Sequence, residues 1–124
     1  MTDTKLLDSS IWIDYFSKEY HQEIINSGEI LIISSLSLFE IKKKFIKDSV
    51  DVNKLHKIME FIKKRSLIIP VDSKIAEKAV EFSVKNKMHM ADSIIYASAI
   101  LNNYTVITLD NHFEGLDKAI VIKF

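Results

Sequence analysis

The sequence predicts an α/β fold in which helices cover both faces of a parallel sheet. Short apolar runs of strand length alternate with longer segments whose apolar residues recur every three or four positions. The short runs are apolar at successive positions, which is typical of strands that are buried on both faces. We therefore expect a three-layer α/β/α arrangement around five parallel strands.

The first half of the chain contains two strand-helix pairs and a further helix. The change of period is clearest after the run ILIIS, where Leu38, Ile41 and Phe45 are spaced as on one helical face. The expected elements are a strand over 5–8, a helix over 10–20, a strand over 30–34, a helix from 35 onward and a helix over 51–64.

The second half continues the alternation. Asp72 stands where an N-cap residue would begin a helix. The expected elements are a strand over 67–71, helices over 73–85 and 91–101, and strands over 105–108 and 119–123. In such a sheet the crossover helices begin near the carboxyl ends of the strands, so polar residues at strand ends and helix starts share one rim.

Length and composition set limits on the class of protein. A chain of 124 residues is the size of one domain, so we expect a single domain over residues 1–124. There is no cysteine, which excludes disulfides and thiolate metal sites and fits a reducing cytoplasm. The first residues lack the pattern of a signal peptide, and no apolar run is long enough to span a bilayer. We therefore expect a cytoplasmic protein with no membrane partner.

The net charge is zero, but the charges are unevenly distributed. Residues 42–65 carry nine basic and three acidic side chains, so this region is at plus six and the remainder is at minus six. Two solvated helices would explain the excess. A surface that guides a phosphate backbone would also explain it, and the lysines that start the region are then candidates for RNA binding: Lys42, Lys43, Lys44 and Lys47.

Four carboxylates are expected on the common rim. Asp8 ends the first strand, Glu40 lies early in the helix after the second, Asp92 begins the helix before the fourth, and Asp110 follows the fourth. If the first and fourth strands are central neighbours, as in the order 3-2-1-4-5, Asp8 and Asp110 flank the point where the strand order reverses.

Each carboxylate also has a local explanation. Asp8 could cap a helix, Ser37 to Glu40 matches a capping box, Asp92 could favour a helix dipole, and Asp110 could form an Asx turn. Ser or Asn would serve most of these purposes, however, and four carboxylates at one rim repel each other unless a cation is bound. Oxygen ligands of this kind suit Mg²⁺ or Mn²⁺, which can promote phosphodiester hydrolysis.

Four segments together resemble one family. They are LLDSSIWIDYF at 6–16, SLSLFEIKKK at 35–44, MADSIIYASAI at 90–100 and VITLDNHFEGL at 106–116. In order and spacing they resemble the PIN domain, and within it the VapC-type ribonuclease toxins of toxin-antitoxin systems. The resemblance covers essentially the whole chain.

The resemblance implies a parallel sheet of order 3-2-1-4-5 and an endoribonuclease that depends on Mg²⁺ or Mn²⁺. It also implies a homodimer and a small antitoxin partner. Asp8 and Asp92 would be the main metal ligands, with Glu40 and Asp110 completing the acidic group. Hydroxyls at Ser10 and Thr108 would support the site.

His112 and the aromatic residues need separate interpretation. Some relatives carry an acid two residues after the position of Asp110, where this sequence has His112, so a second metal is not expected to be held strongly. A surface turn is favoured for His112 itself. For Trp12, Tyr15 and Phe16 a place in the core or a dimer interface is favoured over RNA stacking.

Two other functions are compatible with an acidic rim on an α/β sheet. A phosphoacceptor signalling module would need adjacent acids at the first strand and a lysine after the last strand with a helix beyond it. Here Asp3 lies five residues before Asp8, and Lys123 is next to the last residue. The third possibility is a PIN fold kept as a binding domain without catalysis.

Overall fold

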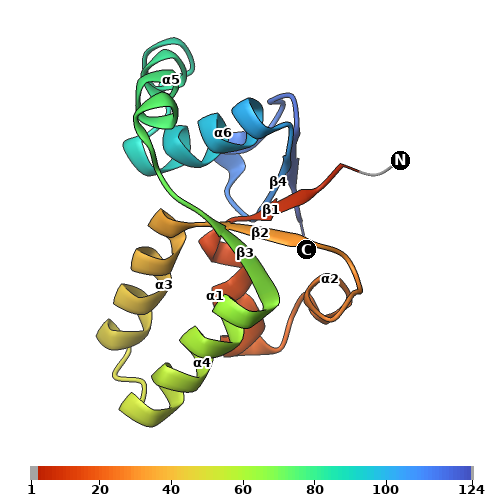
Figure 1. The fold of residues 1–124 in the computed structure, drawn as a ribbon, viewed down its shortest axis with the longest axis vertical. Coiled ribbons are helices and arrows are strands. Elements are labelled where there is room, and N and C mark those ends of the chain that lie inside the picture. The colour runs from red at the N-terminus through yellow and green to blue at the C-terminus, as the bar shows by residue number, and fades with distance from the viewer. Residues whose placement is uncertain (1–2, 124) are drawn as a thin grey trace.

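A computed structural model describes residues 3–123 (Figure 1). Its centre is a five-stranded sheet in the order β3-β2-β1-β4-β5 in which all neighbouring strands are parallel. This confirms the predicted fold class and strand order. The strands are β1 (Lys5–Leu7), β2 (Leu31–Ser34), β3 (Ser66–Ile69), β4 (Thr105–Thr108) and β5 (Ala119–Val121).

Six α-helices and a short 3₁₀ helix lie in the described range. The predicted helices occur within one or two residues of their expected bounds, and two short elements, α2 and η1, were not predicted. The helices are α1 (Ser9–Lys18), α2 (Gln22–Ile25), α3 (Ser35–Lys47), α4 (Val52–Arg65), α5 (Ser73–Lys85), α6 (Met90–Asn102) and η1 (Asn111–Phe113).

The helices form two layers on opposite faces of the sheet (Figure 1). Successive strand residues point to opposite faces, so the two cores draw on alternate positions. Leu7 and Ile33 pack in the cluster that includes α1, α3 and α4, whereas Leu6 and Ile32 pack in the cluster that includes α6 and Phe113. The central strands are therefore buried on both faces, as the unbroken apolar runs indicate.

The outer strands depart from that expectation. In β3, Leu67 and Ile68 are exposed, and Ile120 in β5 is exposed as well. Both strands are at the edges of the sheet, where each has a neighbour on one side only. A run of apolar residues therefore does not distinguish an edge strand from a central one.

The helices α3, α4 and α5 each begin at a side chain that accepts a backbone hydrogen bond. Asp72 accepts from the backbone N–H of Ile75 at 2.9 Å and begins α5, as predicted. Asp51 caps α4 in the same way. Across residues 3–123, no helix is both long and apolar enough to cross a membrane. The prediction of one domain over 1–124 includes residues 1, 2 and 124, which lie outside the described residues, and it stays a prediction.

Candidate metal centre

The predicted carboxylates come from elements that meet at the carboxyl ends of the central strands. Asp8 directly follows β1, and Asp110 lies two residues beyond β4, the parallel neighbour of β1. The backbone N–H of Asp8 donates to the carbonyl of Ile107 at 3.0 Å, which extends this pairing to the rim. Glu40 lies in α3, and Asp92 lies in the first turn of α6. The topology therefore directs all four to one region.

Asp8 is the most buried of the four, with 7% of its surface exposed. It occupies the N-cap position of α1, yet its side chain makes no capping hydrogen bond. Its Oδ2 instead accepts hydrogen bonds from Ser10 Oγ at 3.0 Å and Thr108 Oγ1 at 2.8 Å. Burial raises the pKa of Asp8, and the two hydroxyls partly oppose that rise by stabilising the charged form. Capping alone therefore does not explain this carboxylate.

The two hydroxyls also hold the backbone beyond β4. Ser10 Oγ accepts from the N–H of Leu109 at 3.1 Å, and Thr108 Oγ1 accepts from the N–H of Asp110 at 3.0 Å. Each hydroxyl thus donates to Asp8 and accepts from the loop that carries Asp110. These contacts link two otherwise separate segments, and a supporting role for Ser10 and Thr108 in a metal site stays a prediction.

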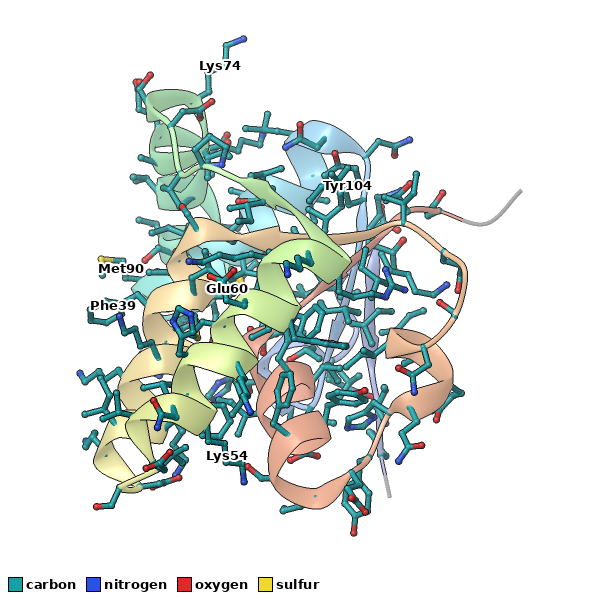
Figure 2. The ribbon with its side chains drawn as sticks, turned by 60° about the horizontal axis from the view of Figure 1, so that its bottom comes forward. Phe39, Lys54, Glu60, Lys74, Met90 and Tyr104 are labelled. Atoms are coloured by element: carbon teal, nitrogen blue, oxygen red, sulfur yellow. The ribbon has the colours of Figure 1, made fainter. Side chains whose placement is uncertain are left out.

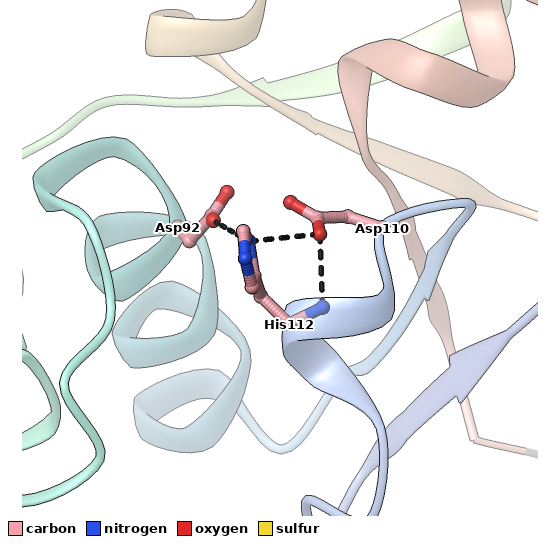
Figure 3. A group of neighbouring side chains, drawn as sticks. All are labelled: Asp92, Asp110 and His112. Atoms are coloured by element: carbon pink, nitrogen blue, oxygen red, sulfur yellow. Dashed lines mark hydrogen bonds and ion pairs between the residues drawn. The ribbon is translucent and has the colours of Figure 1, made fainter.

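Asp92, Asp110 and His112 form a compact group (Figure 3). One ligand atom from each lies within 4.8 Å of the others, a spacing that could hold a metal ion. His112 Nδ1 is 3.0 Å from Asp110 Oδ1 and 3.7 Å from Asp92 Oδ2. Burial, followed by the charge of Asp110 and a hydrogen bond between the two carboxyl groups, raises the pKa of Asp92 to about 7.

Asp110 combines this position with a local role. Its Oδ1 accepts from the backbone N–H of His112 at 2.9 Å, which is the Asx turn expected from the sequence. The backbone N–H and the ring Nδ1 of His112 both contact Oδ1 of Asp110. The other carboxylate oxygen, Oδ2, makes neither of these contacts. The local explanation and a ligand role are therefore compatible for this residue.

Glu40 is half-buried, and it is not part of a capping box. The helix α3 begins at Ser35 with Ser34 as its cap, so the predicted Ser37 to Glu40 box was wrong by one turn. Burial raises the pKa of Glu40, and the charge of Asp8 raises it further, while a hydrogen bond with Ser9 opposes the rise. The sequence gives no signal for Ser9 other than its position directly after Asp8.

His112 is both exposed and close to the carboxylates. Its side chain is 62% exposed, as expected for a surface turn, but its ring contacts two of the predicted ligands. The ring of His89 packs edge-on against that of His112 with centroids 5.5 Å apart. His89 is also the N-cap residue of α6. The interpretation of His112 as a surface turn residue is therefore incomplete.

The aromatic residues after Asp8 are buried or partly buried. Trp12 is fully buried, and Tyr15 and Phe16 pack edge-to-face with ring centroids 5.0 Å apart. Phe61 of α4 contacts both of these rings. Trp12 is therefore a core residue, Tyr15 and Phe16 pack against the core, and a role of these residues in a dimer interface stays a prediction.

The predicted RNA-binding lysines lie on the exposed side of α3. Lys42, Lys43, Lys44 and Lys47 are all exposed, and Lys44 pairs with Asp48 at 3.3 Å. Phe39, which precedes Glu40, is also exposed, and sequence analysis did not single it out.

The donor set at the rim fits a hard divalent cation. Carboxylate oxygens are the preferred ligands of Mg²⁺ and Mn²⁺. Burial raises the pKa values of three of these carboxylates, and the negative charge of a neighbouring carboxylate raises them further. The three are Asp8, Asp92 and Glu40. Among residues 3–123, His112 is the basic side chain that contacts this group, through Asp92 and Asp110. A single imidazole does not balance four carboxylates, so a divalent ion would relieve the remaining repulsion.

Known proteins share this fold along almost its whole length. A toxin-antitoxin complex from Klebsiella pneumoniae is 25% identical with a TM-score of 0.78, over 95% of this chain and 97% of that chain. VapBC from Salmonella typhimurium, bound to DNA, is 18% identical with a TM-score of 0.76, over 98% of both chains. VapC20 from Mycobacterium tuberculosis, described as a toxin that cleaves the sarcin-ricin loop, is 12% identical with a TM-score of 0.70, over 92% and 95%.

No curated protein sequence matches the chain. A model of the PIN domain family matches residues 5–119, which is most of the sequence. The sheet order and the acidic rim agree with that match. The chain therefore belongs to the PIN domain family.

Proposed function

We propose that this protein is a divalent-metal-dependent endoribonuclease and the toxin of a toxin-antitoxin pair. The observation that carries the proposal is the convergence of four carboxylates from separate elements at one end of the sheet. Asp8, Asp92, Asp110 and Glu40 would hold Mg²⁺ or Mn²⁺ and act as the catalytic group. When bound, such an ion supplies charge neutralisation and water activation for phosphodiester hydrolysis.

The chain's own groups would prepare the site for that ion. Ser10 and Thr108 fix the orientation of the Asp8 carboxylate, because both donate to the same oxygen. Thr108 also fixes the loop of Asp110. His112 lies at the exposed edge of the group, where its imidazole could donate to a phosphate oxygen.

The partners are proposed on the basis of similar structures. The complexes from Klebsiella pneumoniae and Salmonella typhimurium are toxin-antitoxin assemblies, which supports a small antitoxin as partner for this chain. We further propose an RNA substrate, a homodimer and a location in the cytoplasm, a reducing compartment that suits a chain without disulfides. Size-exclusion chromatography with light scattering would test the homodimer.

The signalling alternative is not favoured by the topology. A receiver-like module has the doubly wound order 2-1-3-4-5, whereas this sheet has the order 3-2-1-4-5. A PIN-fold binding domain without catalysis has the same topology as the proposed enzyme. Only a measurement of hydrolysis separates those two.

The deciding experiment is RNA cleavage by purified protein with Mn²⁺ or Mg²⁺ and with EDTA. We expect metal-dependent cleavage by the wild type and its loss in Asp8→Asn and Asp92→Asn. The matched control is Glu77→Gln, which neutralises an exposed carboxylate on α5 and should leave cleavage unchanged. Equal cleavage by the wild type and both Asn variants would reject the proposal.

A further inference from the structure

The side of α3 next to the acidic group presents an aromatic ring surrounded by lysines. Phe39 is 63% exposed, which is unusual for a large aromatic side chain in a helix that otherwise packs against the core. Figure 2 shows its ring projecting away from the sheet. The neighbouring residue in sequence is Glu40, one of the proposed metal ligands.

The lysines around Phe39 are available for a charged partner. Helical periodicity places Lys42 and Lys43 one turn after Phe39, and Lys47 one turn further along the same face. Within the described part of the chain, none of these three lysines forms an ion pair, whereas Lys44 pairs with Asp48. Lys43 Nζ lies 5.7 Å from the centre of the Phe39 ring, within the range of a cation-π interaction. The ring thus lies beside a positive charge, and the exposed apolar side chains of Ile46 and Val52 line adjoining depressions with it.

A shallow depression beside this ring includes Glu40 in its lining. It has a volume of about 300 Å³ and is lined by Phe39, Glu40, Lys43, Lys44 and Lys47. The lining therefore combines a proposed metal ligand, an aromatic residue and three lysines. An unpaired nucleotide contains the complementary parts, which are a flat base and a phosphate on either side of it.

A second exposed apolar residue lies at the start of α6. Met90 is 72% exposed and precedes Asp92 by two residues. In Figure 2, Met90 and Phe39 project from the same side of the molecule, from α6 and α3 respectively. Exposed apolar side chains thus adjoin two of the proposed ligands in sequence, which suits contact with bases on both sides of a bound phosphate.

We propose that Phe39 is a stacking platform for an unpaired base of single-stranded RNA, with Lys43 and Lys47 contacting the adjacent phosphates. This inference rests on the proposed ribonuclease function and extends it to the form of the substrate. A base that stacks on Phe39 places its phosphate next to Glu40 without any sequence-specific hydrogen bond. Phe39 is then a positioning residue that selects unpaired over paired RNA.

Charge favours RNA over a protein partner at this surface. Apart from Glu40, the depression is lined by cationic and aromatic groups, and the cations adjoin the proposed site of phosphate hydrolysis. An apolar peptide would have to remove water from the ammonium groups of three lysines. A polyanion instead replaces its counterions with those lysines.

The test measures RNA binding in EDTA, so that cleavage does not interfere. The probe is a short single-stranded RNA that contains 2-aminopurine, whose fluorescence falls when the base stacks on a ring. We expect quenching and saturable binding with the wild type. Base stacking on an aromatic ring contributes about 1–3 kcal/mol, so Phe39→Ala should weaken binding by roughly 5- to 150-fold and remove the quenching.

Matched variants separate stacking from general effects. Phe39→Trp should retain quenching, whereas Phe39→Leu, which keeps an apolar side chain, should lose it. Val84→Ala removes an equally exposed apolar group from α5 and should bind like the wild type. Lys43→Ala should weaken binding and flatten its salt dependence, and Lys74→Ala on α5 should do neither.

The possible results distinguish this inference from the proposed function. If the wild type cleaves RNA while Phe39→Ala and Phe39→Leu bind and quench like the wild type, the stacking platform is rejected and the enzyme stands. If no cleavage occurs but quenching depends on Phe39, the enzyme is rejected and RNA binding stands. If Phe39→Ala abolishes binding of a co-expressed antitoxin but leaves RNA affinity unchanged, the surface binds protein and the inference is overturned.

Discussion

Thr108 Oγ1 donates a 2.8 Å hydrogen bond to Asp8 Oδ2, although the two residues are 100 positions apart in sequence. The bond is possible because β1 and β4 are parallel neighbours, so their carboxyl ends lie side by side. The same hydroxyl accepts from the N–H of Asp110. One side chain therefore couples two of the proposed ligands.

Replacing Thr108 by valine tests that coupling. The substitution keeps the shape of the side chain but leaves the buried Asp8 carboxylate and the Asp110 N–H without this partner. Hydrogen bonds to such groups are worth about 1–3 kcal/mol, so the free energy of unfolding should fall by that amount. Urea denaturation measures the change, and Thr108→Ser, which retains the hydroxyl, should be much closer to the wild type. An unchanged stability in Thr108→Val would show that water replaces the hydroxyl.

The raised pKa of Asp92 predicts how stability depends on pH without metal. The pKa is about 7 in the folded protein and 3.8 as the ordinary value. Below pH 3.8 both states are protonated, so Asp92 has no effect. As pH rises from there to about 7, the unfolded chain releases the proton while the folded protein retains it, so folding stability falls. Above about pH 7 the loss of folding stability from Asp92 is complete.

The measurement is chemical denaturation in EDTA at several pH values. We expect a loss on the order of 2 kcal/mol between pH 5 and pH 8 from Asp92, which is reduced from the full linkage value because solvent reaches the site. Asp92→Asn should reduce this slope and should be more stable than the wild type at pH 8. If the folding stability of Asp92→Asn depends on pH as steeply as that of the wild type, groups other than Asp92 cause the dependence.

The sequence predicts the sheet well because hydrophobic periodicity and strand-end polarity are local signals. The continuous apolar run ILIIS locates β2 to within one residue. The three- and four-residue spacing of Leu38, Ile41 and Phe45, which follows that run, locates the start of α3 equally well. Exposure is not a local property, however. The exposed residues of β3 and the exposed ring of Phe39 follow from which elements lie beside them, and no single segment encodes that.

The candidate site shows the same limit. The four carboxylates can be located from the order of strands and helices, because parallel topology brings strand ends together. The contact of His112 with Asp92 depends on the short helix η1, which turns the ring back toward α6 after the Asx turn of Asp110. A three-residue 3₁₀ helix has almost no periodicity to detect, so this contact was not predicted.

Binding of a divalent ion should stabilise the folded protein. An ion that binds only the folded state at a concentration about 100 times its dissociation constant adds about 2.7 kcal/mol. We expect Mn²⁺ and Mg²⁺ to raise the melting temperature of the wild type and of Glu77→Gln. Asp8→Asn and Asp92→Asn should show little or no shift. Equal shifts in all four proteins would place the bound ion elsewhere.

His112 occupies a position where an aspartate would change the charge of the site. The ring of His112 faces Asp92 and Asp110, and its positive form lowers the pKa of Asp92. His112→Asp would replace that favourable interaction with a fifth carboxylate. Like charges at this distance repel, so the metal-free protein should be less stable by about 1 kcal/mol or more at pH 8.

The same substitution should increase the effect of metal. A fifth oxygen donor beside Asp92 and Asp110 favours a divalent ion, so the rise in melting temperature with Mn²⁺ should be larger in His112→Asp than in the wild type. Differential scanning fluorimetry with a Mn²⁺ titration measures both effects. His112→Asn is the control, since it removes the imidazole without adding charge and should show neither the extra instability nor the larger shift. If His112→Asp binds Mn²⁺ more weakly than His112→Asn, the imidazole position is not adjacent to the ion.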